Sequence, residues 1–307
     1  MDIFIQQLIN GLTLGAVYAV VALGYTMVYG IIQLINFAHG DVVMIGAMVA
    51  FSVISALAPW GPPPLVIVLV ATGCAVSACM LIGYAMERLA YRPLRGAPRL
   101  APLITAIGVS IILQHLAMMI WSRNPLAFPQ IIKTQSYDIA GATITNVQIA
   151  ILAISVAIMS GLVALVYRTR LGTAMRATAQ NPQVAGLMGI DANRVIAFTF
   201  VIGAALAAVA GVMVASYYGI AHYAMGSQLG LKAFCAAVLG GIGNIPGAML
   251  GGVLLGLVEA LGAGYIGDLT GNVFGSNYQD VFAFIVLIGV LVLRPSGLLG
   301  ERAGDRA

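Results

Sequence analysis

Long runs without a charged residue constrain this chain more than any other feature of its sequence. No charge occurs between Asp2 and His39, and none from Val42 to Met86. A helix needs about 20 apolar residues to cross the hydrocarbon core of a bilayer. Hydrophobic residues make up 61% of the 307 residues and charged residues 8%, whereas soluble domains are roughly a quarter charged. We therefore expect an integral membrane protein, an all-α polytopic bundle of transmembrane helices.

Breaks in the apolar runs predict eight or nine spans. Prolines at 59 and 62–64 divide the run 42–86 in two, because a helix does not continue through them. The stretch 229–266 is cut at 240–246, so it holds either two crossings or one crossing and a re-entrant segment. The other expected spans cover 8–31, 100–122, 147–167, 195–218 and a last segment that ends at Leu293.

Arginines gather in three places, which predicts the orientation of the chain. Two loops and the C-terminal segment hold them: Arg88, Arg92, Arg95 and Arg99; Arg168, Arg170, Arg176 and Arg194; Arg294, Arg302 and Arg306. The positive-inside rule places all three groups in the cytoplasm. Counting spans then places the N-terminus and Lys133 outside. In that outer loop, residues 136–145 form either a small hairpin that turns at Gly141 or a plain connector.

The loop 168–194 carries clear helix-boundary signals. Asn181 followed by Pro182 is typical of a helix N-cap and first residue, and Gly189 is a typical C-terminal stop. A short helix over 182–188 is expected. One face of this helix is apolar at spacings i, i+3 and i+4, formed by Val184, Leu187 and Met188. This stripe either rests on the bilayer or neighbouring helices, or docks into a groove of a partner subunit.

Two polar interruptions of the apolar runs are candidates for a translocation pathway or subunit interface. Irregular backbone at membrane depth persists only beside protein or a water-filled cavity. The candidate residues are Asn36, His39, Asp41, Gly240, Gly243 and Asn244. Each interruption is followed by Gly-Ala-Met, which is consistent with an internal repeat whose interface forms the pathway. The alternative is two ordinary cytoplasmic turns.

Glu259 joins these candidates because it lies deep in the apolar run LLGLVEALGAG. Exposing a carboxylate to lipid is costly, so Glu259 faces a cavity, faces a partner, or is a paired or protonated structural residue. We favour a pathway or interface role.

The sequence lacks the motifs of catalytic and nucleotide-binding proteins. No G-x-x-x-x-G-K-[ST] phosphate-binding loop occurs, and no His, Cys, Asp and Glu spacing is typical of a metal site. We expect no catalytic residue, no metal, no cofactor and no nucleic-acid partner. Few ionisable residues lie within the expected spans, with Asp41 and Glu259 as the main candidates, and this scarcity also argues against an ion-coupled carrier.

Six stretches along nearly the whole chain resemble the inner-membrane permeases of high-affinity branched-chain amino acid importers, which belong to the ATP-binding-cassette (ABC) class. These stretches are 24–47, 87–96, 176–190, 194–212, 231–252 and 294–300. The resemblance implies one transmembrane permease domain over 1–307 in the bacterial inner membrane, with 168–194 as its ATPase-coupling loop. The coupling residues would be Arg176, Asn181, Pro182, Val184, Leu187, Met188 and Gly189. One departure is that Arg176-Ala177-Thr178 stands where the importer loop begins Glu-Ala-Ala, so the ionic contact of that Glu is in question.

The resemblance also implies partners and a transported substrate. The partners would be two ABC ATPase subunits, a second related permease, a periplasmic or extracellular amino-acid-binding protein and the surrounding lipids. The substrates would be leucine, isoleucine, valine or related amino acids. A permease of this family for urea, amides or other small solutes is the first alternative, and a self-sufficient channel or carrier is the second.

Overall fold

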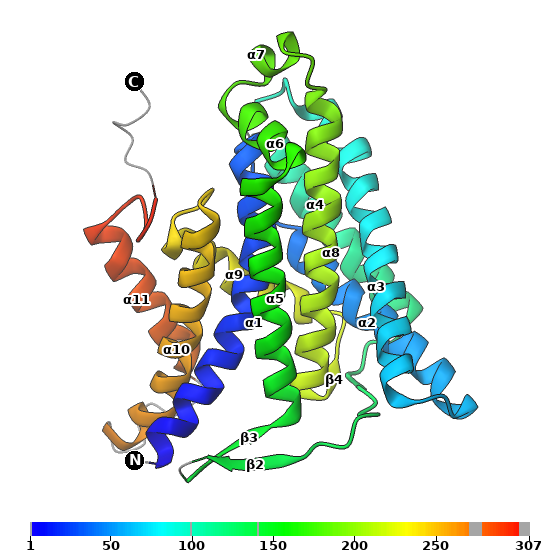
Figure 1. Ribbon diagram of the computed structural model, residues 1–307, viewed down its shortest axis with the longest axis vertical. Helices are drawn as coiled ribbons and strands as arrows, with labels where there is room; N and C mark the ends of the chain where they lie inside the picture. The colour runs from blue at the N-terminus through cyan, green and yellow to red at the C-terminus, as the bar shows by residue number, and fades with distance from the viewer. Residues whose placement is uncertain (1, 99, 140, 270–277, 301–307) are drawn as a thin grey trace. The chain divides into compact units, whose positions relative to one another are not determined.

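The computed structural model describes residues 2–98, 100–139, 141–269 and 278–300, so Arg99, Arg302 and Arg306 lie outside the described residues. Helices dominate these ranges (Figure 1). The α-helices are α1 (Asp2–Ile32), α2 (His39–Leu57), α3 (Pro64–Met86), α4 (Leu100–Ile120), α5 (Asn146–Arg168), α6 (Arg170–Gln180), α7 (Pro182–Leu187), α8 (Ala192–Tyr218), α9 (Met225–Gly240), α10 (Ile245–Leu269) and α11 (Gln279–Leu293).

Short irregular helices extend α2 and α3. The 3₁₀-helix η1 (Ala58–Trp60) follows α2, and Gly61 then turns the chain with a φ of 70°. The prolines at 62–64 form the connection, and Pro64 occupies the first position of α3, where its missing N–H costs nothing. At its other end α3 continues into the π-helix η2 (Glu87–Tyr91) and the 3₁₀-helix η3 (Arg92–Leu94). The predicted break in the run 42–86 is confirmed.

Seven helices within the described residues are long and apolar enough to cross a membrane: α1, α2, α3, α4, α5, α8 and α10. The predicted all-α, polytopic class is confirmed, whereas the predicted number of spans was eight or nine. The difference lies in α9 and α11, which have 16 and 15 residues. Helices of that length reach only about 24 Å, less than the ~30 Å hydrocarbon core. The eighth and ninth spans therefore depend on these two shorter helices.

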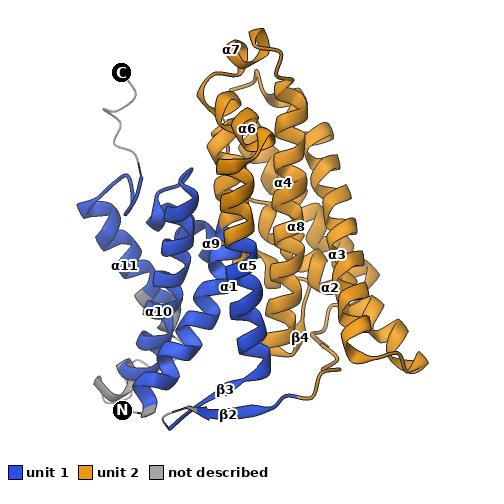
Figure 2. Ribbon diagram, in the orientation of Figure 1, with its two compact units in different colours: residues 1–22, 134–159, 232–307 blue, residues 23–133, 160–231 orange. Residues whose placement is uncertain are grey.

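Two compact units divide the chain (Figure 2). Unit 1 comprises residues 1–22, 134–159 and 232–307, and unit 2 comprises residues 23–133 and 160–231. Three of the boundaries between the units fall inside α1, α5 and α9, and the fourth falls between residues 133 and 134, in the connection from α4 to α5.

In unit 2, the core is formed by α2, α3 and α8, which pack along one another. Small side chains let the helices approach closely, and Ala204, Ala207 and Ala208 of α8 are almost fully buried. The thiol of Cys79 donates a hydrogen bond to the Val42 carbonyl at 3.4 Å, which joins α3 to α2.

In unit 1, α10 packs directly on the first part of α1. A Cβ atom at Gly256 would lie 2.2 Å from the backbone nitrogen of Gly15, a distance that no side chain tolerates. The glycine at 256 therefore sets how closely these two helices approach. The same unit holds the contact between α10 and α11.

Two short pairs of strands lie in the connections. Strands β2 (Ser136–Ile139) and β3 (Ala142–Thr145) pair antiparallel, and Gly141 between them has a φ of 84°. Of the two alternatives for residues 136–145, the structure has the hairpin. A second pair, β1 (Leu126–Ala127) and β4 (Ile220–Ala221), joins segments far apart in the sequence. Within unit 2, the segment with α6 and α7 lies at the opposite end from β4 (Figure 2).

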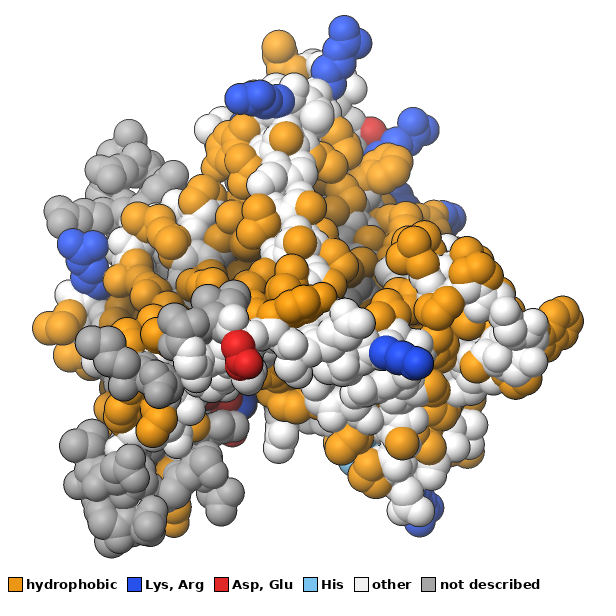
Figure 3. Space-filling model, turned by 60° about the horizontal axis from the view of Figure 1, so that its bottom comes forward, with side chains coloured by type: hydrophobic (Ala, Val, Ile, Leu, Met, Phe, Trp, Pro, Cys, Tyr) orange, Lys and Arg blue, Asp and Glu red, His pale blue; other side chains and the backbone are white. Residues whose placement is uncertain are grey.

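Large apolar side chains are exposed along several helices, as expected for surfaces that face lipid. On α3, Leu65, Leu69 and Leu81 are each more than 60% exposed. In Figure 3 orange hydrophobic side chains are spread widely, whereas blue Lys and Arg side chains are isolated from one another. A water-soluble protein rarely leaves so much contiguous apolar surface uncovered.

Candidate functional site

The connection between α5 and α8 folds into two short helices with well-formed caps. Thr169 caps α6, and its hydroxyl accepts a hydrogen bond from the Gly172 backbone N–H at 3.1 Å. Asn181 caps α7, and its side-chain oxygen accepts hydrogen bonds from Gln183 N–H at 3.0 Å and Val184 N–H at 3.1 Å. Pro182 is the first residue of α7. The short helix predicted over 182–188 is confirmed, with its last turn ending at Leu187.

Gly189 ends α7 in the manner that its sequence position predicts. Its φ is 82°, in the left-handed region that favours glycine. The Ile190 N–H reaches back to the Ala185 carbonyl at 3.0 Å, as in a Schellman cap. Asp191 then caps α8 by accepting from the backbone N–H groups of Asn193 and Arg194. Two caps and one glycine thus fix the direction of α7.

The apolar stripe of α7 faces away from the rest of unit 2. Leu187 is 87% exposed, Met188 79% and Val184 53%, whereas Ala185 on the same helix is buried. The described part of the chain therefore does not cover this stripe, which excludes its own neighbouring helices as the covering surface. Figure 2 shows α7 at the tip of unit 2, beyond α6. The bilayer and a partner protein remain as possible contacts.

The Arg176 side chain makes its contacts with residues of the same chain. Its guanidinium donates to the Val166 carbonyl at the end of α5 and lies 5.5 Å from the centre of the Tyr167 ring. Arg176 therefore ties α6 to α5, a role that its position in the loop 168–194 did not predict.

Replacing Asn181 with Ala should loosen α7 without unfolding the protein. The change removes the acceptor for two backbone N–H groups, which typically costs about 1 kcal/mol. Hydrogen exchange of the Gln183 and Val184 amides should accelerate roughly fivefold. Asn181→Asp should restore most of the protection, because Asp also accepts these bonds. Unchanged exchange in Asn181→Ala would show that the cap does not hold the helix.

The first polar interruption forms a buried cluster at the start of α2, within unit 2. The side-chain oxygen of Asn36 accepts from the Ala38 N–H at 3.1 Å and from the Tyr91 hydroxyl at 2.9 Å. His39 packs edge-on against the Tyr25 ring, with centroids 4.7 Å apart. Asp41 accepts from the Gln114 amide at 2.9 Å. All three candidate residues are at most 4% exposed.

The second interruption is a tight turn between α9 and α10, within unit 1. Gly241 and Gly243 both have positive φ. The Asn244 side chain accepts from the Gly247 N–H at 3.0 Å and donates to the Leu299 carbonyl at 2.7 Å. The Leu299 N–H in turn donates to the Gly240 carbonyl at 2.9 Å. The segment after α11 therefore holds this turn in place.

Glu259 is paired with a lysine of the same unit. The Lys232 ammonium lies 2.5 Å from a Glu259 carboxylate oxygen and 2.6 Å from one of Asp280. It also lies 5.9 Å from the centre of the Tyr18 ring. Glu259 is 1% exposed, and its second carboxylate oxygen has no hydrogen-bond partner among the described residues. Lys232 therefore neutralises Glu259, while the Asp280 side chain is 47% exposed.

The candidate pathway residues thus fall into three places. Asn36, His39 and Asp41 are adjacent in unit 2. In unit 1, the turn at 240–244 is separated from Glu259 by 15 residues of α10, about 22 Å along the helix axis. Glu259 does not share a site with that turn.

Sequence reasoning missed the partners of these residues. It singled out neither Tyr91 and Gln114, which bind Asn36 and Asp41, nor Lys232 and Asp280 beside Glu259. One signal was available for Lys232. A lone base in one apolar run and a lone acid in another are each costly unless they pair.

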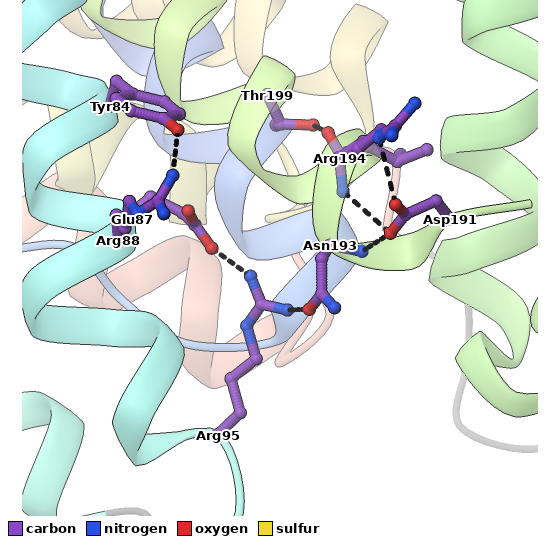
Figure 4. Close-up of polar contacts among 9 residues, drawn as sticks. Tyr84, Glu87, Arg88, Arg95, Asp191, Asn193, Arg194 and Thr199 are labelled. Atoms are coloured by element: carbon purple, nitrogen blue, oxygen red, sulfur yellow. Dashed lines mark hydrogen bonds and ion pairs between the residues drawn. The ribbon is translucent and has the colours of Figure 1, made fainter.

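A further polar network joins the end of α3 to the start of α8 (Figure 4). Glu87 is 2% exposed and forms an ion pair with Arg95. Arg95 also donates to the Asn193 side-chain oxygen at 2.5 Å. Burial lowers the pKa of the Arg95 guanidinium, and Glu87 partly offsets this effect. The side chain stays protonated, because arginine titrates far above neutral pH.

Comparisons with known proteins identify the family. A family model described as the permease component of branched-chain amino acid transport systems matches residues 7–291. The chain belongs to this family. Within the described residues, no group of three or more His, Cys, Asp or Glu side chains is placed to hold a metal ion. The protein is a transport subunit rather than an enzyme, and a multi-pass protein of the bacterial inner membrane.

Relatives match over nearly full length. The high-affinity branched-chain amino acid transport system permease protein BraD of Pseudomonas aeruginosa is 48% identical over 303 residues, covering 97% of this chain and 96% of that protein. The corresponding LivH proteins of Salmonella typhimurium and Escherichia coli K12 are 46% and 45% identical over 304 residues, with the same coverage. No solved structure matches. The predicted family resemblance is confirmed.

Proposed function

We propose that this permease subunit carries leucine, isoleucine, valine or related amino acids across the inner membrane, together with a second related permease. Two separate ABC ATPase subunits supply the energy, and a periplasmic binding protein delivers the substrate. The relatives named above are permeases of high-affinity branched-chain amino acid systems, which supports the substrate class. The exposed apolar stripe of α7 is the observation that supports docking of the ATPase subunits.

Three properties of α7 support docking of an ATPase there. The helix is capped at both ends, so it is rigid enough to transmit a displacement. Its apolar residues are uncovered, and an apolar helix face that inserts into a groove is a common mode of recognition. α7 also lies at the end of unit 2 that carries the two arginine-rich loops, the loop after α3 and the loop 168–194. Residues 168–194 would be the coupling loop, with Asn181, Pro182 and Gly189 shaping it and Arg176 fixing it to α5.

The buried polar residues remain our candidates for the translocation pathway or the permease interface. Asn36, His39 and Asp41 are polar side chains buried close together in unit 2. Polar and ionisable residues inside a membrane protein are costly and are typically functional. The Lys232–Glu259–Asp280 cluster reaches the surface of the described chain at Asp280. This partial exposure favours contact of the cluster with a second permease.

Transport measurements test the substrate class. A deletion strain that carries this permease with its neighbouring transport subunits should take up labelled leucine in competition with unlabelled valine. Labelled urea serves as the control solute. Uptake of urea but not of leucine would replace the proposed substrate, and flux into liposomes containing this chain alone would replace the ATP-driven mechanism.

The orientation of the chain makes a separate prediction. Gly96 is exposed in the arginine-rich loop after α3, and no atom obstructs a side chain there. In a cysteine-free background, Gly96→Cys should react with a membrane-impermeant maleimide only in inverted vesicles, because this loop is cytoplasmic. Lys133→Cys should react only in intact spheroplasts. Labelling of both positions from one side would overturn the proposed topology and displace the coupling loop from the cytoplasm.

A further inference from the structure

A pocket of about 420 Å³ lies between the end of α3 and the start of α8, within unit 2 (Figure 4). Its volume is in the range of pockets that hold small ligands. Arginines line it on both sides: Arg88 and Arg92 come from the segment after α3, and Arg194 comes from the first turn of α8. Aromatic and apolar side chains form the rest of its wall, chiefly Tyr84, Phe198 and Val201.

The pocket carries an excess of positive charge. Glu87 is neutralised by Arg95, and Asp191 lies 3.1 Å from the Arg194 guanidinium. Arg88 and Arg92 have no carboxylate partner within the described residues. The pocket lining itself holds three arginines and two carboxylates. Arg95 does not line the pocket but neutralises Glu87 from beside it, so the local charge is about +2. The composition of the pocket therefore favours an anion.

The lengths of the two helices place the pocket at the depth of lipid headgroups. The apolar helical segment that begins with α3 runs from Pro64 to Leu94, 31 residues, and α8 has 27. About 20 residues fill the hydrocarbon core. Counted from Pro64, that core ends near Tyr84. Counted back from the other end of α8, it ends near Phe198, so the arginines extend beyond it on both helices.

Both walls repeat the same order of side chains. Tyr84 and Arg88 are four residues apart on the α3 segment, as are Phe198 and Arg194 on α8, so each pair shares one helix face. The Arg88 guanidinium donates to the Tyr84 hydroxyl at 2.6 Å. Leu81, one turn before Tyr84, is 70% exposed and continues the lipid-facing stripe of α3. The arginines therefore stand at the mouth of the pocket, and the apolar wall leads toward the membrane interior.

We propose that this pocket binds the headgroup of an anionic phospholipid of the cytoplasmic leaflet, with its phosphate between Arg88, Arg92 and Arg194. The upper part of an acyl chain would lie along Tyr84, Phe198 and Val201. Basic pockets between transmembrane helices on the cytoplasmic side recognise anionic lipids through this combination of charge and apolar surface. Because Arg194 lies in the first turn of α8, the helix that follows α7, a lipid held here would also fix one end of the proposed coupling loop.

Native mass spectrometry of the full-length protein in a neutral detergent tests the proposal. Phosphatidylglycerol should bind, and phosphatidylcholine, which has no net charge, should bind at least tenfold more weakly. Arg92→Gln should weaken phosphatidylglycerol binding about fivefold, since each basic residue near an anionic surface contributes about that much. Removing Arg88, Arg92 and Arg194 together should weaken it about a hundredfold. Arg92 is exposed, so its single variant should fold normally.

A matched triple variant controls for net charge. Arg123, Arg168 and Arg170 are exposed and do not line the pocket, so their joint replacement by Gln should leave phosphatidylglycerol binding unchanged. Equal losses in both triple variants would overturn the proposal, because binding would then follow total charge.

A competition experiment distinguishes a lipid headgroup from a soluble phosphate as the ligand of the pocket. Glycerol 3-phosphate at millimolar concentration should not displace the lipid, and Phe198→Ser should weaken phosphatidylglycerol binding by removing part of the acyl-chain contact. Displacement by glycerol 3-phosphate, together with wild-type binding by Phe198→Ser, would show that the pocket takes a soluble phosphate and would overturn the lipid proposal.

Discussion

Leu187→Asp should abolish co-purification of the ATPase subunits with this permease while the transmembrane helices still insert. Leu187 is 87% exposed at the tip of unit 2, so the change leaves the packing of the chain itself intact. In a docked complex it would place an unpaired charge in a desolvated contact, which costs several kcal/mol. Such a loss weakens assembly by about a hundredfold or more. The measurement is affinity purification through a tag on the permease, followed by mass spectrometry and substrate-stimulated ATP hydrolysis.

Two control variants sharpen this experiment. Thr173→Asp adds the same charge at an exposed position of α6, away from the stripe, and should assemble normally. Leu187→Ala removes apolar contact without adding a charge and should give an intermediate loss. If Leu187→Asp assembled and hydrolysed ATP like the wild type, α7 would not be a docking surface. The ATPase contact would then have to lie elsewhere on the cytoplasmic side.

Lys232→Met should be among the most destabilising single substitutions in the chain. Lys232 pairs with both Glu259 and Asp280, so its removal leaves the fully buried Glu259 carboxylate unpaired. Breaking a buried ion pair in this way costs about 3–5 kcal/mol. The expected results are low expression in the membrane fraction and a clear drop in the thermal unfolding temperature measured in detergent.

The double variant Lys232→Met, Glu259→Met separates the charge effect from packing. Replacing both members of a buried pair by apolar residues of similar volume is often close to neutral. The double variant should therefore be more stable than Lys232→Met alone, a coupling that a double-mutant cycle measures directly. If the double variant were no better than the single one, the Lys232–Glu259 ion pair would not account for the loss.

Glu259→Gln distinguishes a structural role from a functional one. In this variant Lys232 keeps Asp280 as its partner, so expression should stay near the wild-type level. Loss of leucine uptake, or of assembly with the second permease, would then assign Glu259 to the pathway or the interface. Wild-type transport would leave it as a paired structural residue.

The sequence by itself determined most of the secondary structure of this protein. The prolines at 62–64, the Asn181-Pro182 pair and Gly189 act on the backbone at their own positions, through a fixed φ, a missing N–H or a side-chain acceptor. Their effects are local, and the structure has its breaks and caps where these residues stand. The family could also be predicted from the sequence, because the motifs that characterise it are contiguous stretches of sequence.

Tertiary structure alone decided which polar groups meet. Glu259 is 27 residues from Lys232 and 21 from Asp280 in the sequence, and Asn36 is 55 residues from Tyr91. No local rule specifies such pairs, because they depend on how the helices pack. The same holds for the arginine pocket, where residues about a hundred positions apart come together across α3 and α8. The hydrophobic composition predicted that these residues lie in or near a membrane. The packing of the helices determined which charged side chains are paired with an opposite charge and which are not.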